Sequence, residues 1–234
     1  SGVNSLYNNS AGINNLAIGN SSLFQNQGSN NIAVGHEALY NNASTSGNVA
    51  IGYQAAYSNL ANSNTIIGYQ AGKNNTSGNI TALGYQALNA NTTGIRNTAV
   101  GFIALSGNTT GQRNAAFGSY TLIQNTTGTQ NTAIGDVALQ NNTTAGNNTA
   151  LGYASMYSNT TGESNTSVGS ESFFANTTGN FNTAVGFQSL RFNTTGSSNT
   201  ANGYRALYNN TTGIYNTAND TSISRRSDRI NRRW

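Results

Sequence analysis

The sequence predicts an all-β protein, a parallel β-solenoid (β-roll) of about 13 coils of 16–17 residues. Two observations carry this prediction. An apolar residue followed by glycine recurs along the chain, and a polar turn sequence separates the copies. The spacing is 17 residues, with three intervals of 16. A disordered chain has no reason to keep this phase, so the low hydrophobic content of 35% does not indicate disorder. The glycines in phase are Gly2, Gly19, Gly35, Gly52, Gly68, Gly84, Gly101, Gly118, Gly135, Gly152, Gly169, Gly186 and Gly203.

Counted from the glycine as position 1, the unit reads G-[YF]-Q-A-L-x-x-N-T-T-G-x-x-N-T-A-[IVL], and residues 84–100 are a complete copy. Seventeen residues suffice for two short extended segments and two turns. Such a coil stacks on the next one through backbone hydrogen bonds, about 4.8 Å away. We therefore expect one coil per repeat over residues 1–220.

The first extended segment covers positions 15 to 17. Position 17 is almost always apolar, and position 15 is aliphatic in the early units and threonine in most later ones. Two residues apart on a strand share one side, and we expect this side to face the interior. The alanine at position 16 then faces outward, as a strip of small residues where another chain packs. The candidate trimer-packing residues are Ala99, Ala133, Ala150 and Ala184.

The second segment has a large apolar residue at position 5, which we expect to form the other half of the core. Aromatic residues gather at positions 2 and 6. A strand would place both away from position 5, whereas a helical turn would bring positions 2, 5 and 6 together; the sequence leaves both conformations open. The candidate surface-binding aromatics, all at position 2, are Tyr53, Tyr69, Tyr85, Tyr153 and Tyr204.

Asn-Thr-Thr-Gly between the segments is typical of a turn, in which we expect the glycine to supply a positive φ. Each copy also fits the N-glycosylation sequon. A turn repeated for structural reasons produces such sequons without any role for sugar, and we favour that interpretation. Stacked coils bring equivalent residues together, so we expect the asparagines at positions 8 and 14 to form hydrogen-bonded ladders along the stack.

The composition argues against an enzyme. Only 7% of residues are charged, and there is one histidine and no cysteine, so most routes to acid–base, nucleophilic or metal catalysis lack their side chains. We expect no cofactor and no metal. His36 beside Glu37 occupies the aromatic position 2, which indicates a structural role. Glu163 and Glu171 lie within one repeat length of each other but lack the spacing of a calcium loop.

Charge is concentrated at the C-terminal end. Residues 1–220 carry equal numbers of basic and acidic side chains, whereas residues 221–234 carry five arginines and one aspartate. Ile223, Ile230 and Trp234 fall on one helical face, so we expect a basic cap or the start of a helical stalk there. The neutral body argues against nucleic-acid binding, and no apolar run is long enough for membrane insertion.

Two copies of the unit resemble repeats of a known protein family. They are Asn131-Thr132-Ala133-Ile134-Gly135 and Asn182-Thr183-Ala184-Val185-Gly186-Phe187-Gln188-Ser189-Leu190. This unit resembles the head repeats of trimeric autotransporter adhesins, and similar repeats occur in phage tail fibres and large bacterial surface proteins. The resemblance covers about residues 2–220. It implies a parallel β-roll and three chains side by side, with small residues facing the shared axis. It also implies an extracellular location, on a virion fibre or a cell surface.

Together these observations predict a structural and adhesive fibre segment. We expect a homotrimer that attaches to a host surface receptor, such as a glycan, through many weak contacts. The alternative is an ice-binding solenoid with a threonine ladder, which the expected inward direction of position 15 argues against. A glycan-cleaving fibre would need a pair of carboxylates in a groove. The ladder threonines are Thr98, Thr132, Thr149, Thr166, Thr183 and Thr200.

Overall fold

The computed structural model describes residues 1–219, which are all-β and form a parallel β-solenoid, as predicted. Thirteen short strands, one per repeat, delimit twelve complete coils. Each strand occupies the three residues before the next glycine, which are numbered 15 to 17 in the shorter units too, except that β13 ends at position 16. The strands are β1 (Leu16–Ile18), β2 (Ile32–Val34), β3 (Val49–Ile51), β4 (Thr65–Ile67), β5 (Thr81–Leu83), β6 (Thr98–Val100), β7 (Ala115–Phe117), β8 (Thr132–Ile134), β9 (Thr149–Leu151), β10 (Thr166–Val168), β11 (Thr183–Val185), β12 (Thr200–Asn202) and β13 (Thr217–Ala218).

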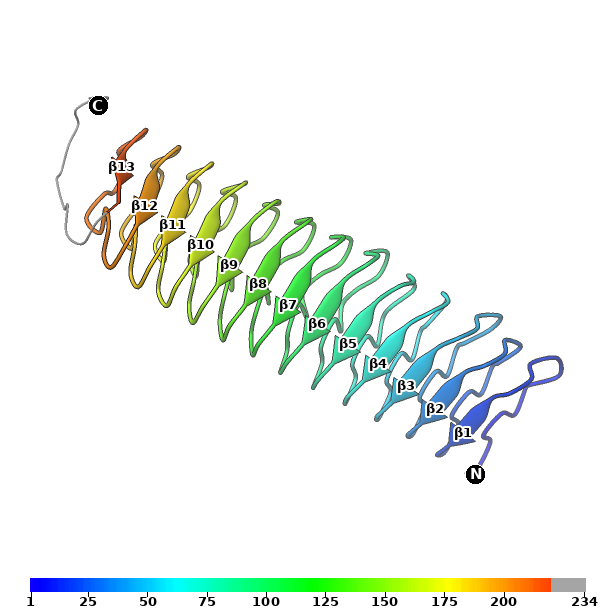
Figure 1. The fold of residues 1–234 in the computed structure, drawn as a ribbon. Coiled ribbons are helices and arrows are strands. Elements are labelled where there is room, and N and C mark those ends of the chain that lie inside the picture. The colour runs from blue at the N-terminus through cyan, green and yellow to red at the C-terminus, as the bar shows by residue number, and fades with distance from the viewer. Residues whose placement is uncertain (220–234) are drawn as a thin grey trace. The chain divides into compact units, whose positions relative to one another are not determined.

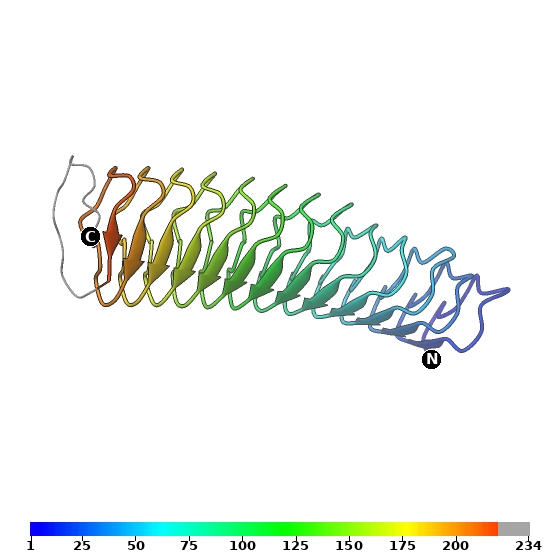
Figure 2. The same ribbon diagram turned by 45° about the horizontal axis from the view of Figure 1, so that its top comes forward.

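The described chain divides into two compact units, residues 1–116 and 117–219. Within each unit neighbouring strands are parallel, and residues of the same repeat position lie opposite each other, such as Ala133 opposite Ala150. The strands of a unit line one wall of the solenoid, and turn segments complete each coil (Figures 1 and 2). The predicted basic cap or stalk at residues 221–234 lies outside the described residues.

The predicted direction of the strand side chains is wrong. In every strand the residue at position 16 is buried, and the residues at positions 15 and 17 are exposed or half-buried; β8 is typical, with Ala133 inside and Thr132 and Ile134 outside. The predicted outward packing residues Ala99, Ala133, Ala150 and Ala184 are fully buried within their own chain. They therefore cannot contact a sister chain.

The physical reason is the width of the coil. The interior already holds the large apolar residue of position 5, such as Leu139, and the asparagines of positions 8 and 14, such as Asn142 and Asn148. These side chains fill the space opposite the strand, so only a methyl group fits beneath it. The prediction that position 5 forms part of the core is confirmed, for example at Leu23, Leu88 and Leu139.

One coil shows the limit on volume directly. Ile66 takes the place of the inward alanine in β4, and Gly72 takes the place of the core leucine six residues later. A Cβ added at Gly72 would lie 2.9 Å from Cδ1 of Ile66. The large and the small residue have exchanged places across the interior, so the total side-chain volume of the coil is nearly conserved.

This exchange predicts strong coupling between two substitutions. Ile66→Ala alone leaves a cavity and costs about 2–5 kcal/mol in the free energy of unfolding. Ile66→Ala with Gly72→Leu restores the pattern of the other coils, because the backbone of Gly72 (φ 50°) matches that of Leu88 (φ 53°). We expect the double variant to lie within about 1 kcal/mol of the wild type in urea unfolding. A double variant less stable than Ile66→Ala would contradict the exchange.

The second segment is neither a strand nor a helical turn. It consists of two tight turns in succession. In the coil that begins at Gly52, the amide of Ala55 donates to the carbonyl of Gly52 (3.3 Å) and that of Asn59 to the carbonyl of Ala56 (3.1 Å). Gln54 and Ala56 have positive φ angles of 50° and 52°. Left-handed residues at positions 3 and 5 therefore form the corner.

The two repeated glycines serve different purposes. Gly84, at position 1, has a φ of 139°, and a Cβ there would lie 2.3 Å from the carbonyl oxygen of Gly101. Gly94, in the Asn-Thr-Thr-Gly turn, has no positive φ, so the expectation for it is wrong. A Cβ at Gly94 would instead strike the carbonyl oxygen of Gly111 (2.3 Å) and Oδ1 of Asn91 (2.6 Å). This glycine leaves room for the asparagine and for the next coil.

The predicted asparagine ladders are confirmed within each unit. The Asn159 amide donates to Oδ1 of Asn142 (3.0 Å) and to the carbonyl of Gly162 (3.0 Å), and its Oδ1 accepts from Asn176 (2.7 Å). Asn159 is fully buried. Its amide nitrogen is therefore not accessible for glycosylation in the folded protein, which supports a structural origin of the sequons.

Candidate functional site

The outer side of the strand wall is an uncharged surface, which we call the strand face and define as the residues at positions 15 and 17. None of the thirteen described strands contains a charged residue. Several large apolar side chains of the strand face are more than a third exposed. Exposed apolar patches of this kind mark contact surfaces in soluble proteins. They are Leu16, Ile18, Ile32, Ile51 and Leu83 in the first unit and Phe117, Ile134 and Leu151 in the second.

Threonines continue the strand face in the second unit. Position 15 is threonine in every strand from β8 to β13, and equivalent threonines of neighbouring strands lie opposite each other, as Thr149 and Thr166 do. Thr149, Thr166, Thr183 and Thr200 are exposed. Five of the six predicted ladder threonines, from Thr132 to Thr200, therefore form a row that faces outward rather than inward, and Ala115 of β7 separates Thr98 from them.

The five tyrosines predicted as surface-binding aromatics are all exposed, with exposed fractions from 41% for Tyr53 to 55% for Tyr153. Tyr53, Tyr69 and Tyr85 form a continuous stack, with ring centroids 5.1 and 5.2 Å apart. His36 stacks on Tyr53 at 5.3 Å, which confirms that it takes an aromatic position in the row. Tyr204 stacks on Phe187 at 5.6 Å.

A second aromatic row runs along position 6. Tyr7, Phe24, Tyr40 and Tyr57 stack at 4.9 to 5.2 Å in the first unit. Burial in this row raises the pKa of the Tyr57 hydroxyl, with smaller contributions from the charges of Glu37 and Tyr40. The hydroxyl therefore remains protonated at neutral pH. In the second unit, Tyr157 and Phe174 stack at 5.0 Å.

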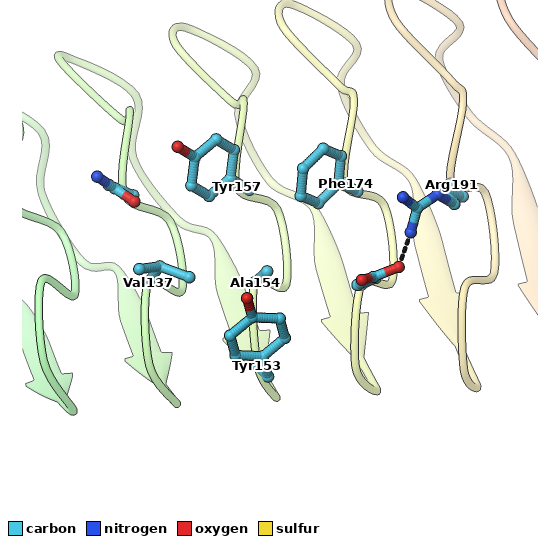
Figure 3. A pocket seen from close by; sticks show the side chains of 8 residues that line it. Val137, Tyr153, Ala154, Tyr157, Phe174 and Arg191 are labelled. Atoms are coloured by element: carbon cyan, nitrogen blue, oxygen red, sulfur yellow. Dashed lines mark ion pairs between the residues drawn. The ribbon is translucent and has the colours of Figure 1, made fainter.

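A cavity of about 400 Å³ lies beside Tyr157 and Phe174 (Figure 3). Ala154 and Val137 also line it, and the view places the Tyr153 ring on the opposite side of Ala154 from the other two rings. Its volume falls within the range of small-ligand pockets. We call it the aromatic pocket.

Polar groups border the aromatic pocket as well. Gln140, Glu171 and Arg191 line it. Glu171 forms an ion pair with Arg191 and accepts a hydrogen bond from Nε2 of Gln188 (2.7 Å). The guanidinium of Arg191 also lies over the Phe174 ring, 5.1 Å from its centroid. The carboxylate and the guanidinium neutralise each other, so the pocket carries polar groups without net charge.

The remaining sequence candidates are not brought together. Glu171 pairs with Arg191, whereas Glu163 is exposed and its backbone amide donates to Oδ1 of Asn180. The His36 ring lies 3.6 Å from the Glu37 carboxylate. Within residues 1–219 no group of three or more histidine, cysteine or acidic side chains is placed to hold a metal ion.

Sequence reasoning missed the aromatic pocket. The signal was present: Ala154 interrupts position 3, where glutamine or another longer side chain is common. A small residue such as Ala154 leaves a gap only if the side chains of the neighbouring coils do not fill its space. The sequence alone does not show which side chains those are. The outward direction of the threonines was also missed.

Comparisons with known proteins add no relative. No protein-family model matches the chain, and no curated protein or solved structure matches it either. In the part of the chain that the structure describes, no helix is long and apolar enough to cross a membrane.

Proposed function

We propose that the protein is a structural and adhesive fibre segment that assembles as a homotrimer through the strand face. The observation that carries the proposal is the exposure of an uncharged apolar strip on successive strands. The occupant that fits is a second copy of the chain. An identical solenoid presents rows at the same spacing, so contacts made by one pair of strands repeat along the whole face.

The trimer and the extracellular fibre follow from the resemblance to adhesin heads and tail fibres. A narrow coil buries few large apolar side chains, and association through the strand face would add apolar burial at each coil. The tyrosine rows lie outside this face and remain available for a host surface. Each contact would be weak, and many equivalent rings would act together.

Charges placed on the strand face test the association. Ile134→Asp with Leu151→Asp should weaken assembly at least 100-fold, because two carboxylates would be buried without partners. The measurement is light scattering over a concentration series, in which the wild type should reach three times the 24.4 kDa chain mass. Thr161→Asp with Thr178→Asp adds the same charge at exposed turn positions and should leave assembly unchanged. Wild-type protein that stays monomeric at micromolar concentration would refute the proposal.

The outward threonine ladder supports ice binding as a second candidate. Regular rows of hydroxyl and methyl groups on a flat sheet can hold ordered water. The aliphatic residues Leu16, Ile32 and Val49 replace threonine in the first three strands, which favours a protein contact over a hydrated one. Thermal hysteresis separates the two functions: activity in the wild type that Thr149→Tyr and Thr166→Tyr abolish would favour ice binding.

A further inference from the structure

The aromatic pocket lies where a side-chain ladder along position 3 is absent. At position 3 of the first unit, side-chain amides join successive coils: Gln54 donates to Glu37 (2.7 Å), Gln70 to Gln54 (3.0 Å) and Gln86 to Gln70 (3.0 Å). After Gln86 the position is held in turn by Ile103, Tyr120, Val137 and Ala154, and the ladder resumes only where Gln188 donates to Glu171. Ala154 is the smallest of these residues. The methyl group of Ala154 reaches neither neighbour.

A comparison of two coils shows what this residue changes. Residues 52–57 read Gly-Tyr-Gln-Ala-Ala-Tyr and residues 152–157 read Gly-Tyr-Ala-Ser-Met-Tyr, so the two tyrosines are the same. Ser155 and Met156 also differ from the first coil, but both are fully buried in the interior, which leaves Ala154 as the difference at the surface. The backbone is also the same, with a φ of 50° at Gln54 and 52° at Ala154. The space that a glutamine side chain fills in the first coil is therefore open in the second.

The open space has the chemistry of a sugar site. Tyr153 and Tyr157 supply aromatic rings for the C–H face of a pyranose. The Phe174 ring lies between Tyr157 (5.0 Å) and Arg191 (5.1 Å), so it borders the pocket without offering a free face. Glu171, Arg191 and Gln140 supply acceptors and donors for its hydroxyls. Because Glu171 and Arg191 are paired, the pocket favours a neutral ligand over a charged one.

We propose that the aromatic pocket binds one neutral pyranose unit of a surface glycan. This assignment rests on the proposed adhesive function only in that the sugar is taken to belong to a host surface. The geometry of the pocket lies within residues 137–191 and uses no residue of the strand face. The trimer would carry three such pockets, so sugar chains could be held by several of them at once.

Ala154→Gln is the decisive variant, because it restores the residue of the equivalent coil on a matching backbone and fills the pocket. The measurement is saturation-transfer NMR of the full chain with D-glucose, D-galactose, D-mannose and N-acetyl-D-glucosamine. The wild type should bind at least one of them, and Ala154→Gln should weaken that binding at least tenfold. Tyr157→Ala should weaken it similarly. Thr161→Ala changes an exposed turn residue outside the pocket and should have no effect.

Two results would contradict the proposed sugar site. One is the absence of saturation transfer to any of the four sugars in the wild type, and the other is saturation transfer in Ala154→Gln equal to that in the wild type. Tighter binding of N-acetylneuraminic acid, which carries a carboxylate, would overturn the assignment to a neutral ring. Light scattering of the same samples keeps the two proposals apart. If the protein is a trimer that binds no sugar, only the proposal of a sugar site is rejected. If it is a monomer that binds sugar, only the proposal of a trimer is rejected.

Discussion

Gly84→Ala should destabilise the protein by more than about 3 kcal/mol, because two costs add at this position. The backbone angle of 139° is one that residues with a side chain rarely adopt, and the new methyl group would lie 2.3 Å from the carbonyl oxygen of Gly101. Neither atom can move freely, because Gly101 belongs to the next coil of the same stack. Relief of the contact would require the coils to separate locally, and their backbone hydrogen bonds would lengthen.

Gly47→Ala is the matched control. Gly47 also has a positive φ, of 70°, but nothing lies within 4 Å of a Cβ added there. We expect a loss of about 1 kcal/mol from the backbone alone. Equilibrium urea unfolding followed by circular dichroism measures both variants. Equal losses for Gly47→Ala and Gly84→Ala would mean that coil-to-coil contact is not what requires glycine at position 1.

Asn159→Ala should cost about 4 kcal/mol, because it breaks a ladder from both sides. The substitution removes the three hydrogen bonds that join Asn159 to Asn142, Gly162 and Asn176. The abandoned amide and carbonyl groups stay buried where water does not reach them. Thr161→Ala, at an exposed position of the same turn, should change stability by less than about 0.5 kcal/mol.

Asn159→Asp tests the donor specifically, since it keeps the size and shape of the side chain. In this variant a carboxylate oxygen replaces the amide nitrogen. It faces two acceptors, Oδ1 of Asn142 and the carbonyl of Gly162, and has no hydrogen to donate to either. Burial raises the pKa of such a carboxyl above its unfolded value, so the variant gains stability as the pH falls. Urea unfolding at pH 7 and at about pH 4 should show the larger loss at pH 7. A pH-independent loss would contradict the ladder.

The period of the repeat was enough to predict the fold. Thirteen glycines in phase define thirteen strands, and the large residues of position 5 were correctly assigned to the core. The regular asparagines also predicted the ladders, because stacking in phase brings Asn142, Asn159 and Asn176 into line. These features depend only on sequence spacing, which determines which residues of neighbouring coils meet.

The direction of the strand could not be predicted from apolar character alone. Alternation shows that Thr132 and Ile134 share one side and Ala133 the other, but not which side is inside. Large apolar residues usually lie in protein interiors, which favours the wrong side here. What decides is volume: Leu139, Asn142 and Asn148 leave room only for a methyl group, and Ile66 enters only where Gly72 withdraws. The candidate aromatics are exposed, as predicted, whereas the pocket beside Tyr153 depends on how its coil stacks on the neighbouring ones.

A side-chain-resolution reconstruction of the assembled protein, by crystallography or electron microscopy, tests the central claim most directly. The account predicts three chains whose strand faces meet, with Thr132 and Ile134 against a sister chain and Ala133 enclosed in its own coil. An assembly joined along the alanine row, or one in which Ile134 and Leu151 face solvent while the chains meet elsewhere, would contradict it.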